Sequence, residues 1–524
     1  MRPSLLFLAL LTGLATAQEP AASAKKPVEG QPSEKSEKSD KSDKSEKSDK
    51  PDKAEKPDKD APAPVTKDGS VTIGGKKIDY KVTTSKLAIE KDDGSPRASI
   101  FNVSYIRQNA GDVSKRPVLF AFNGGPGSAS VWLHIGTLGP KRVDLPGDGT
   151  AAPQPPARLV ANESSILDVA DLVFVDPVST GYSRAAKGVN TSEFFGVDED
   201  AEYLSDFIRR WITDNGRWSS PKFLLGESYG GIRVAGLASQ LQSRFGLALN
   251  GVVMLSSVVD FRTLSPSQGN DLAYQVYLPN YAAIAHFHGK VKGDRDALVK
   301  DAQDFAAGEY TSALFKGSRL DPAARQKVAE KLSALTSLPV ELILQCDLRI
   351  DPSRFRGELL RKEGKVLGRF DARVAWPTTD PSRATPEYDP SFSLTQGAYS
   401  TAMLDYLAKD LGWKEEAPYE ILTGKVQPWR WGSGNSYANQ SERLAGAMRD
   451  NPYLHVLVMG GYADLACPPD AIAYTFAHLD LPDVTRKNIT YTSYEAGHMF
   501  YLNPPDLLKE RKDLVDFINA ALPN

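Results

Sequence analysis

Ser228 lies in the sequence Gly-Glu-Ser-Tyr-Gly, between Gly226 and Gly230. The apolar residues before this sequence predict a strand and those after it predict a helix, so the serine would occupy a sharp strand-to-helix turn. The two glycines leave room for such a turn, and the start of the helix favours negative charge near the hydroxyl. We therefore predict that Ser228 is a nucleophile that attacks a carbonyl carbon. The competing interpretation is a serine that only shapes a turn.

A serine hydroxyl is a weak nucleophile until a base removes its proton, so a histidine must reach it in the folded chain. The sequence contains 6 histidines. His498 follows the strand-like run Ile489–Tyr494 in the sequence Gly-His-Met, and we predict that it is the base. The other histidines fall within predicted elements or a predicted insertion, where a packed or surface imidazole is expected: His134, His286, His288, His455 and His478.

The base needs an acidic partner that fixes its tautomer and stabilises its protonated form. Asp464 follows the predicted strand Leu454–Met459 and precedes His498. This gives the chain order serine, aspartate, histidine. We predict that Asp464 is the acid. The competing interpretation is a turn aspartate, which we expect for Asp470.

A glycine-rich loop, residues 123–127, follows the predicted strand Val118–Phe122 and reads Asn-Gly-Gly-Pro-Gly. Glycines allow backbone N–H groups to point into a site, as the binding of a negatively charged oxygen requires. The loop therefore suggests an oxyanion hole, although taken alone it also fits an ordinary Gly-Pro loop.

Short apolar runs alternate with amphipathic stretches along much of the chain. A Gly-Gly pair within Val71–Tyr80 predicts an antiparallel hairpin. The runs predicted to be buried strands are Val118–Phe122, Leu172–Val175, Phe223–Leu225, Val252–Leu255 and Leu454–Met459. Predicted helices include Asp198–Ile212 and Gly230–Phe245. The alternation predicts an α/β fold with a mostly parallel central sheet and helices on both faces.

Composition divides the chain into parts. A basic start, an apolar run and a small-residue cleavage site predict a signal peptide over residues 1–17. Residues 18–67 consist mainly of Lys, Ser, Asp, Glu and Pro and predict a disordered tether, either a spacing or wall-binding arm or a solvated leader. Residues 68–260 and 440–524 would form the α/β core. Residues 261–439 would be an inserted, mainly helical cap over the carboxyl ends of the strands.

Composition also argues against several classes of protein. Hydrophobic residues make up 41% of the 524 residues, which is enough for an enzyme-sized core. The formal net charge of -3 favours neither nucleic acid nor an acidic membrane. No apolar run approaches the length of about 20 residues that spans a bilayer, and no His-Glu-x-x-His motif suggests a metal, so no cofactor is expected. Cys346 and Cys467 could form one disulfide or remain free thiols.

These motifs, in this order, resemble those of the serine carboxypeptidase family. The motifs that carry the resemblance are Asn-Gly-Gly-Pro-Gly from Asn123, Phe-Val-Asp-Pro from Phe174, Gly-Glu-Ser-Tyr-x-Gly from Gly226, the Asp464 loop, and Gly-His-Met from Gly497. The sequence Asp-Leu-Arg-Ile at 347–350, with Arg354 and Phe355, looks like that of bacterial members. The resemblance spans about residues 68–524 and implies an α/β-hydrolase fold and a serine-type carboxypeptidase activity.

The resemblance also implies roles for further residues. The backbone N–H groups of Gly125 and Tyr229 would form the oxyanion hole. The terminal carboxylate of a peptide substrate would be held by Asn123, Gly124 and Glu227. Glu227 can donate a hydrogen bond to a carboxylate only when it is protonated, which favours acidic conditions. The competing interpretation of Glu227 is a glutamate at the start of a helix without substrate contact.

The chain departs from the family at Thr137. Many relatives carry a second glutamate there, just before the sequence Leu-Gly-Pro. Without it, Glu227 lacks a like-charged neighbour, so we expect its pKa to lie nearer the ordinary value of about 4.3. Cys467 matches a cysteine that some relatives carry near the site, and a small buried apolar residue is an equal alternative.

The sequence therefore predicts a secreted or periplasmic serine hydrolase, most specifically a carboxypeptidase that acts on a peptide substrate. An esterase or acyltransferase with the same triad is one alternative. A non-catalytic binding protein of the same fold is another. Neither nucleic acid nor stable membrane insertion is expected, and the sequence does not indicate an oligomeric state.

Overall fold

The computed structural model describes residues 62–432 and 434–523. The predicted signal peptide, residues 1–17, and nearly all of the predicted tether lie outside the described residues. Within the described part of the chain, no helix combines the length and apolar character needed to cross a membrane.

The first strand, β1 (Val65–Ile73), begins inside the range that we assigned to the tether. Val65 and Thr66 are β-branched residues, and they pair with the neighbouring strand β2 (Lys76–Glu90). The hydroxyls of Thr66 and Thr83 lie 3.1 Å apart across this pair. The boundary at residue 68 is therefore placed too late, because the last tether residues already have strand character.

The predicted hairpin around the Gly-Gly pair is confirmed. β1 and β2 are antiparallel, and Ile73 pairs with Lys76 across a two-residue turn. Gly74 and Gly75 have φ values of 55° and 76°, which glycine adopts without steric cost.

The central sheet continues through further strands. Their bounds are β3 (Pro96–Arg107), β4 (Val118–Phe122), β7 (Asp171–Val175), β8 (Arg184–Ala185), β9 (Lys222–Glu227), β10 (Gly251–Leu255), β13 (His455–Gly461) and β14 (Ile489–Tyr494). In the described part of the chain the order is β1-β2-β3-β7-β4-β9-β10-β13-β14, with β8 beside β3. Six neighbouring strands of this sheet run parallel: β7, β4, β9, β10, β13 and β14. At one edge, β1, β2 and β3 are added in antiparallel orientation. The mostly parallel sheet predicted from the apolar runs is confirmed.

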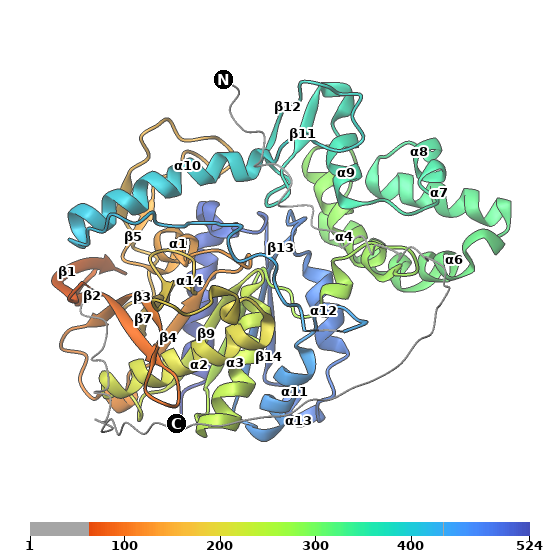
Figure 1. Cartoon of the computed structure of the whole chain (residues 1–524). Helices are drawn as coiled ribbons and strands as arrows, with labels where there is room; N and C mark the ends of the chain where they lie inside the picture. The colour runs from red at the N-terminus through yellow and green to blue at the C-terminus, as the bar shows by residue number, and fades with distance from the viewer. Residues whose placement is uncertain (1–61, 433, 524) are drawn as a thin grey trace, which may run out of the picture. The chain divides into compact units, whose positions relative to one another are not determined.

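Helices cover both faces of this sheet, as predicted (Figure 1). One face packs against α2 (Val197–Asp214), α3 (Gly230–Phe245), α11 (Ser441–Asp450) and α12 (Pro469–Ala477). The other face packs against α1 (Val131–Leu133), α10 (Pro390–Asp405) and α14 (Pro504–Ala520). The remaining small elements of this body are β5 (Lys141–Val143), β6 (Leu159–Ala161) and α13 (Asp483–Arg486). The architecture is that of the α/β-hydrolase fold.

The inserted region is mainly helical and has a hydrophobic core of its own. Its elements are α4 (Leu272–Phe287), α5 (Arg295–Phe305), α6 (Thr311–Lys316), α7 (Pro322–Thr336), α8 (Val340–Gln345), α9 (Pro352–Glu358), β11 (Lys365–Leu367) and β12 (Ala375–Pro377). This core includes Ala463, Leu465 and Ala471, so the insertion packs at the carboxyl end of β13. The last part of the range 261–439 packs on the sheet instead, since Tyr399 and Trp413 belong to the hydrophobic core of the sheet body.

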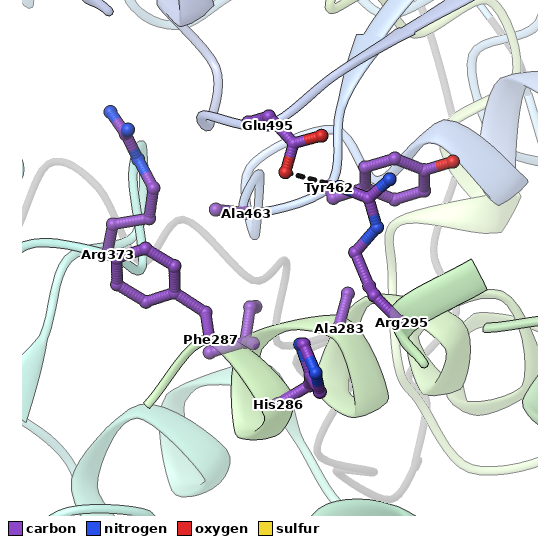
Figure 2. Close-up of a pocket in the computed structure, with 9 residues that line it drawn as sticks. Ala283, His286, Phe287, Arg295, Arg373, Tyr462, Ala463 and Glu495 are labelled. Atoms are coloured by element: carbon purple, nitrogen blue, oxygen red, sulfur yellow. Dashed lines mark ion pairs between the residues drawn. The ribbon is translucent and has the colours of Figure 1, made fainter. Parts of the chain in front are cut away.

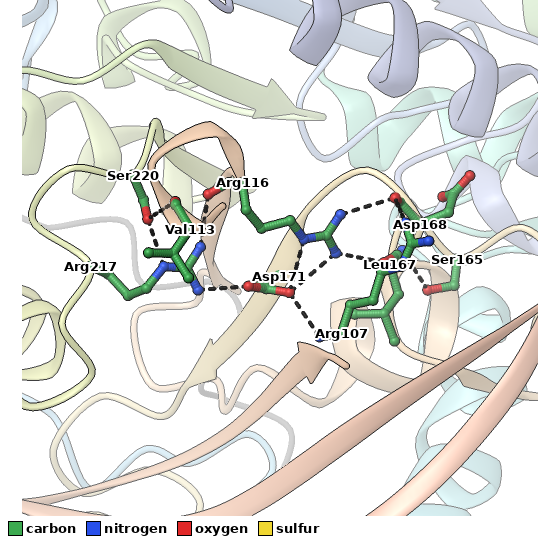
Figure 3. Close-up of polar contacts among 9 residues, drawn as sticks. All are labelled: Arg107, Val113, Arg116, Ser165, Leu167, Asp168, Asp171, Arg217 and Ser220. Carbon is green, nitrogen blue, oxygen red and sulfur yellow. Dashed lines mark hydrogen bonds and ion pairs between the residues drawn. The ribbon is translucent and has the colours of Figure 1, made fainter. Parts of the chain in front are cut away.

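A buried charge cluster joins the amino ends of three strands (Figure 3). Asp171, the first residue of β7, is 1% exposed. Its carboxylate lies 3.1 Å from the guanidinium of Arg116, before β4, and 2.6 Å from that of Arg217, before β9. Arg217 also donates to the backbone oxygen of Arg116 at 2.8 Å. The cluster fixes the relative positions of β4, β7 and β9, and two of these strands carry site loops at their other ends.

Replacing Asp171 should strongly destabilise the protein, because Asp171→Ala leaves two buried guanidinium groups without a carboxylate. We expect a loss of about 3–5 kcal/mol in the free energy of unfolding, measured by urea denaturation. Asp405→Ala is the control, since Asp405 forms an exposed pair with Lys409 one helical turn away. That change should cost less than about 0.5 kcal/mol. Equal losses in the two variants would contradict the structural role of Asp171.

Candidate active site

Ser228 occupies the predicted turn between β9, which ends at Glu227, and α3, which begins at Gly230. Its φ of 63° lies in the left-handed region, which a serine seldom adopts. A Cβ at Gly226 would lie 2.2 Å from the backbone oxygen of Gly230, so the turn excludes any side chain there. The N–H of Ser228 donates to the oxygen of Leu255 at 3.2 Å, which holds the turn against β10.

His498 and Asp464 come together at the carboxyl ends of the last two strands. His498 Nδ1 lies 2.8 Å from Asp464 Oδ2, and both side chains are buried. The other oxygen of Asp464 accepts from the N–H groups of Ala466 at 2.7 Å and Cys467 at 2.9 Å. A carboxylate can only accept, so Nδ1 carries the proton and Nε2 is left to accept one.

Two opposing effects set the basicity of the His498 imidazole. Burial disfavours its charged form and so lowers its pKa, but the charge of Asp464 and the hydrogen bond to it outweigh burial. Glu227 acts in the same direction as Asp464, and the pKa of His498 is raised from its ordinary value of 6.5. His498 can therefore take up a proton readily during a reaction.

The hydroxyl of Ser228 interacts with the thiol of Cys467, which is buried and free. Burial, followed by the charge of Asp464, raises the pKa of this thiol, so it keeps its proton. Among the hydrogen bonds of the described residues, none joins Ser228 to His498. Such bonds often tighten only when substrate binds. Attack would require the hydroxyl to turn from the thiol to the imidazole.

The glycine loop that follows β4 lies directly against the serine turn. A Cβ at Gly124 would lie 2.5 Å from the backbone nitrogen of Tyr229, so only glycine allows this approach. Gly125 has a φ of 105°, again in a region that favours glycine. In the described part of the chain, the N–H groups of Gly125 and Tyr229 have no hydrogen-bond acceptor. They are therefore free to bind a negatively charged oxygen near Ser228, as an oxyanion hole requires.

Asn123 is held in place from three directions. Its Oδ1 accepts from the N–H of Leu133 at 3.1 Å, and its backbone oxygen accepts from the guanidinium of Arg233. Arg233 belongs to α3 and forms a buried ion pair with Asp200 of α2, with an N···O distance of 2.7 Å. The Nδ2 of Asn123 donates to Glu227 Oε2 at 2.8 Å. The loop, the helix after the turn and the turn itself therefore form one rigid unit.

Glu227 is 3% exposed and points into the same cluster. Besides Asn123, the hydroxyl of Tyr501 donates to its Oε2, at 3.1 Å. Burial raises the pKa of Glu227 to about 7, against the lowering influences of His498, Tyr501 and Asn123. The expectation of a pKa near 4.3 is therefore wrong. That expectation considered only the effect of a like-charged neighbour, whereas the loss of solvation on burial is the larger cause of the raised pKa.

A second buried carboxyl group lies near Glu227 and was not predicted. Glu510 of α14 is fully buried, and neither of its oxygens has a geometrically acceptable hydrogen-bond partner. Burial raises its pKa well above the ordinary value, the hydroxyl of Thr137 lowers it and the charge of Glu227 raises it. Burial therefore favours the protonated form of Glu510. Thr137 interacts with an acid that comes from a distant part of the chain.

A pocket of about 280 Å³ lies elsewhere, between α4 and the loops that follow β13 and β14 (Figure 2). Its lining includes Tyr462 and Ala463, just before Asp464, but none of the predicted site residues. The guanidinium of Arg295 pairs with Glu495 across it and stands 4.3 Å above the ring of Tyr462. The lining includes His286 and Glu495 but no serine, threonine or cysteine that could act as a nucleophile. The candidate nucleophile therefore remains Ser228.

The remaining expectations concern the other histidines and possible metals. His134 bonds to the hydroxyl of Tyr105 at 2.7 Å and stacks on Phe174, and burial lowers its pKa to about 3. It is a packed core residue, as expected.

The described residues contain no group of three or more His, Cys, Asp or Glu side chains arranged to hold a metal ion. Cys346 and Cys467 are both free thiols.

A family model described as serine carboxypeptidase matches residues 95–500, which is most of the chain. The chain belongs to the serine carboxypeptidase family. This membership accounts for the motif order that the sequence displays.

Individual relatives in this family are distant. A stretch of 232 residues is 29% identical to the pheromone-processing carboxypeptidase KEX1 of Cryptococcus gattii, and covers 42% of this chain and 32% of that protein. A stretch of 140 residues is 31% identical to serine carboxypeptidase-like 20 of Arabidopsis thaliana, with coverage of 26% and 27%. The matches thus span about a third of the length of these curated relatives, or less.

Among solved structures, KEX1(delta)P, a prohormone-processing carboxypeptidase from Saccharomyces cerevisiae, aligns with a TM-score of 0.53. The alignment covers 84% of this chain and 92% of that structure, at 17% sequence identity. At this identity the likeness shows the shared fold.

The structure brings every predicted site residue of this member of the serine carboxypeptidase family into one region, and it adds residues that sequence analysis missed. Tyr501 lies three residues after His498 but carries no motif of its own. Arg233 resembles any helix residue in sequence, and Glu510 any surface glutamate of an amphipathic helix. Their partners become visible only when α3 and α14 are packed on the sheet.

Changing Ser228 to alanine should abolish hydrolysis and leave the fold intact, because the hydroxyl forms bonds with substrate and contributes little to packing. We expect turnover to fall by several orders of magnitude, measured on peptide and ester substrates. Ser393→Ala, at an exposed position of α10, is the matched control and should retain full turnover. More than about a hundredth of wild-type turnover in purified Ser228→Ala would show that the nucleophile is elsewhere.

Proposed function

We propose that this family member is a serine-type carboxypeptidase that releases C-terminal residues from peptides through an acyl-enzyme on Ser228. The observation that carries this proposal is the buried Asn123–Glu227–Tyr501 cluster beside the serine turn. A serine hydrolase without terminal selectivity has no need for a carboxyl group held protonated next to its nucleophile.

In the first half of the proposed reaction, Ser228 Oγ attacks the carbonyl carbon of the last peptide bond while His498 Nε2 takes the hydroxyl proton. The oxygen that becomes negative accepts hydrogen bonds from the N–H groups of Gly125 and Tyr229. Asp464 stabilises the protonated imidazole through Nδ1. When the intermediate collapses, His498 gives the proton to the departing amine, and the C-terminal amino acid leaves.

In the second half, water attacks the acyl group and His498 again acts as the base. The peptide, shortened by one residue, leaves with a new carboxylate, and Ser228 regains its proton. The free serine and the neutral imidazole are restored, so the cycle consumes only water.

Selection of the terminal residue would come from Glu227. Both hydrogen bonds that Glu227 accepts, from Asn123 and Tyr501, reach its Oε2. Its Oε1 is therefore the oxygen that can hold the proton and donate it to a substrate carboxylate. Gly124 carries no charge, but its lack of a side chain would allow the backbone to come close to the substrate carboxylate. An internal peptide segment has no carboxylate to accept this bond, which favours cleavage at the chain end.

An esterase or acyltransferase with the same triad is the second candidate, because the acyl-enzyme does not depend on whether an amine or an alcohol leaves. Comparing free-carboxyl peptides, blocked peptides and simple esters separates these activities. A non-catalytic binding protein is disfavoured by the 2.8 Å contact between Asp464 and His498, and labelling of Ser228 by a fluorophosphonate would exclude it.

We further propose that the enzyme is exported, to the periplasm or outside the cell, and belongs with the bacterial members of the family. The signal-like residues 1–17 support export. The Asp-Leu-Arg-Ile sequence supports the bacterial assignment, and its Arg349 is used structurally, since it pairs with Asp271 at 2.7 Å. N-terminal sequencing of the exported protein would identify the cleavage site.

Activity on free-carboxyl peptides should fall as pH rises through about 7, the pKa of Glu227. Above that pH Glu227 is ionised, and it repels the substrate carboxylate instead of donating to it. Below it the acid is protonated, but His498, with its raised pKa, progressively becomes cationic and cannot act as a base. We therefore expect a bell-shaped profile of kcat/KM near neutral pH.

Glu227→Gln tests the alkaline side of this profile, because glutamine keeps an N–H donor at every pH. The variant should lose most of the alkaline fall, whereas Glu227→Ala should be slow throughout. Amidated peptides, which carry no carboxylate, are the control substrates and should show little alkaline fall with any variant. The same pH profile for free and amidated peptides would exclude terminal carboxylate recognition by Glu227 while leaving the triad in place.

A further inference from the structure

The loop between β11 and β12 lies over the catalytic imidazole and is hydrogen-bonded to both catalytic loops. The oxygen of Arg369 accepts from the N–H of Leu465 at 3.0 Å, one residue after Asp464. The next oxygen, of Phe370, accepts from the N–H of His498 at 2.5 Å. The insertion therefore contributes residues to the site itself, at fixed positions relative to the triad.

The side chain of Arg369 lies close to the imidazole. Its guanidinium carbon is 5.4 Å from the centroid of the Phe370 ring, and that ring is 5.2 Å from the ring of His498. Arg369 is half-buried. Within residues 62–432 and 434–523, its guanidinium donates no hydrogen bond and forms no ion pair.

The neighbouring carboxylates are directed to other partners. Asp389 accepts the backbone N–H of Arg369 at 3.0 Å and lies 3.8 Å from the guanidinium of Arg356. Asp371 pairs with Arg373 at 2.7 Å. A half-buried guanidinium without a carboxylate has lost part of its hydration and gained no partner, so an arriving carboxylate would bind it well.

Arg369 is not among the main groups that act electrostatically on Glu227, although both residues act on His498 and Cys467. Arg369 acts electrostatically on His498, Cys467 and Tyr277. The groups that dominate the surroundings of Glu227 are instead His498, Tyr501, Asn123 and Asp464. If Glu227 receives the terminal carboxylate, Arg369 is left for a second carboxylate on the same substrate.

We propose that Arg369 is a specificity-determining residue that binds the side-chain carboxylate of a glutamate or aspartate next to the scissile bond. The enzyme would thus favour peptides with an acidic residue at their end or just before it. This inference rests on the proposed carboxypeptidase function and adds a substrate class to it. The planar guanidinium can form two parallel hydrogen bonds with a carboxylate, which an uncharged glutamine side chain cannot reproduce.

The test uses N-blocked peptides that differ only in Glu, Gln or Lys, placed either at the last or at the penultimate residue. Wild-type enzyme should cleave the Glu peptide at least about tenfold faster than the Gln peptide, by kcat/KM, at one of these positions. Arg369→Gln should remove this ratio by lowering cleavage of the Glu peptide more than cleavage of the Gln peptide. Arg369→Glu should favour the Lys peptide.

Arg383→Gln is the matched control, since Arg383 is an exposed arginine in the same region of the insertion and should leave the Glu-to-Gln ratio unchanged. An unchanged ratio in Arg369→Gln, or an equal loss on all three peptides, would overturn the proposal. The proposal would also be overturned if Arg369→Gln lowered cleavage of free-carboxyl peptides but not of amidated peptides, because Arg369 would then bind the terminal carboxylate. Release of the last residue from the Gln peptide tests the proposed function separately.

Discussion

The site depends on the close packing of two loops at the carboxyl ends of neighbouring strands. Gly124, after β4, approaches the backbone nitrogen of Tyr229, after β9, so closely that no side chain fits between them. This contact is possible only because β4 and β9 are paired in parallel and end at the same edge. It brings the loop of Gly125 and the N–H of Tyr229, both without a hydrogen-bond acceptor in the described part of the chain, next to the turn at Ser228. The strained turn at Ser228 persists because β10, α3 and the glycine loop hold it from three sides.

Burial, more than any single charge, sets the electrostatics of this site. For Glu227 the loss of solvation prevails, and the pKa rises although every hydrogen bond to the group opposes the rise. For His498 the same loss of solvation is outweighed, because Asp464 lies in direct contact with Nδ1. The difference is one of partner charge. The charge of His498 and two neutral donors stabilise the carboxylate of Glu227 less than burial destabilises it. A full negative charge at hydrogen-bond distance stabilises the imidazolium of His498 strongly.

Much of the fold and the triad candidates could be predicted from sequence because they depend on local pattern. An apolar run predicted β4 and a strand-like run predicted β14, both with correct bounds, and the spacing of glycines indicated the turn at Ser228. The contacts of Tyr501, Glu510 and Arg369 could not be predicted, since each depends on packing between segments far apart in the chain. The error about the pKa of Glu227 has the same origin, because burial is a property of the whole fold.

The insertion is hydrogen-bonded to the loops that carry Asp464 and His498. Its loop between β11 and β12 accepts hydrogen bonds from backbone groups beside Asp464 and at His498, so it cannot shift without disturbing the triad. The side chains on this loop can nevertheless vary, because those hydrogen bonds involve only backbone atoms. Residues at the position of Arg369 can therefore change charge or size while the loop keeps its geometry. This arrangement separates the backbone that contacts the predicted triad from the side chains that, under our proposal, would meet the substrate.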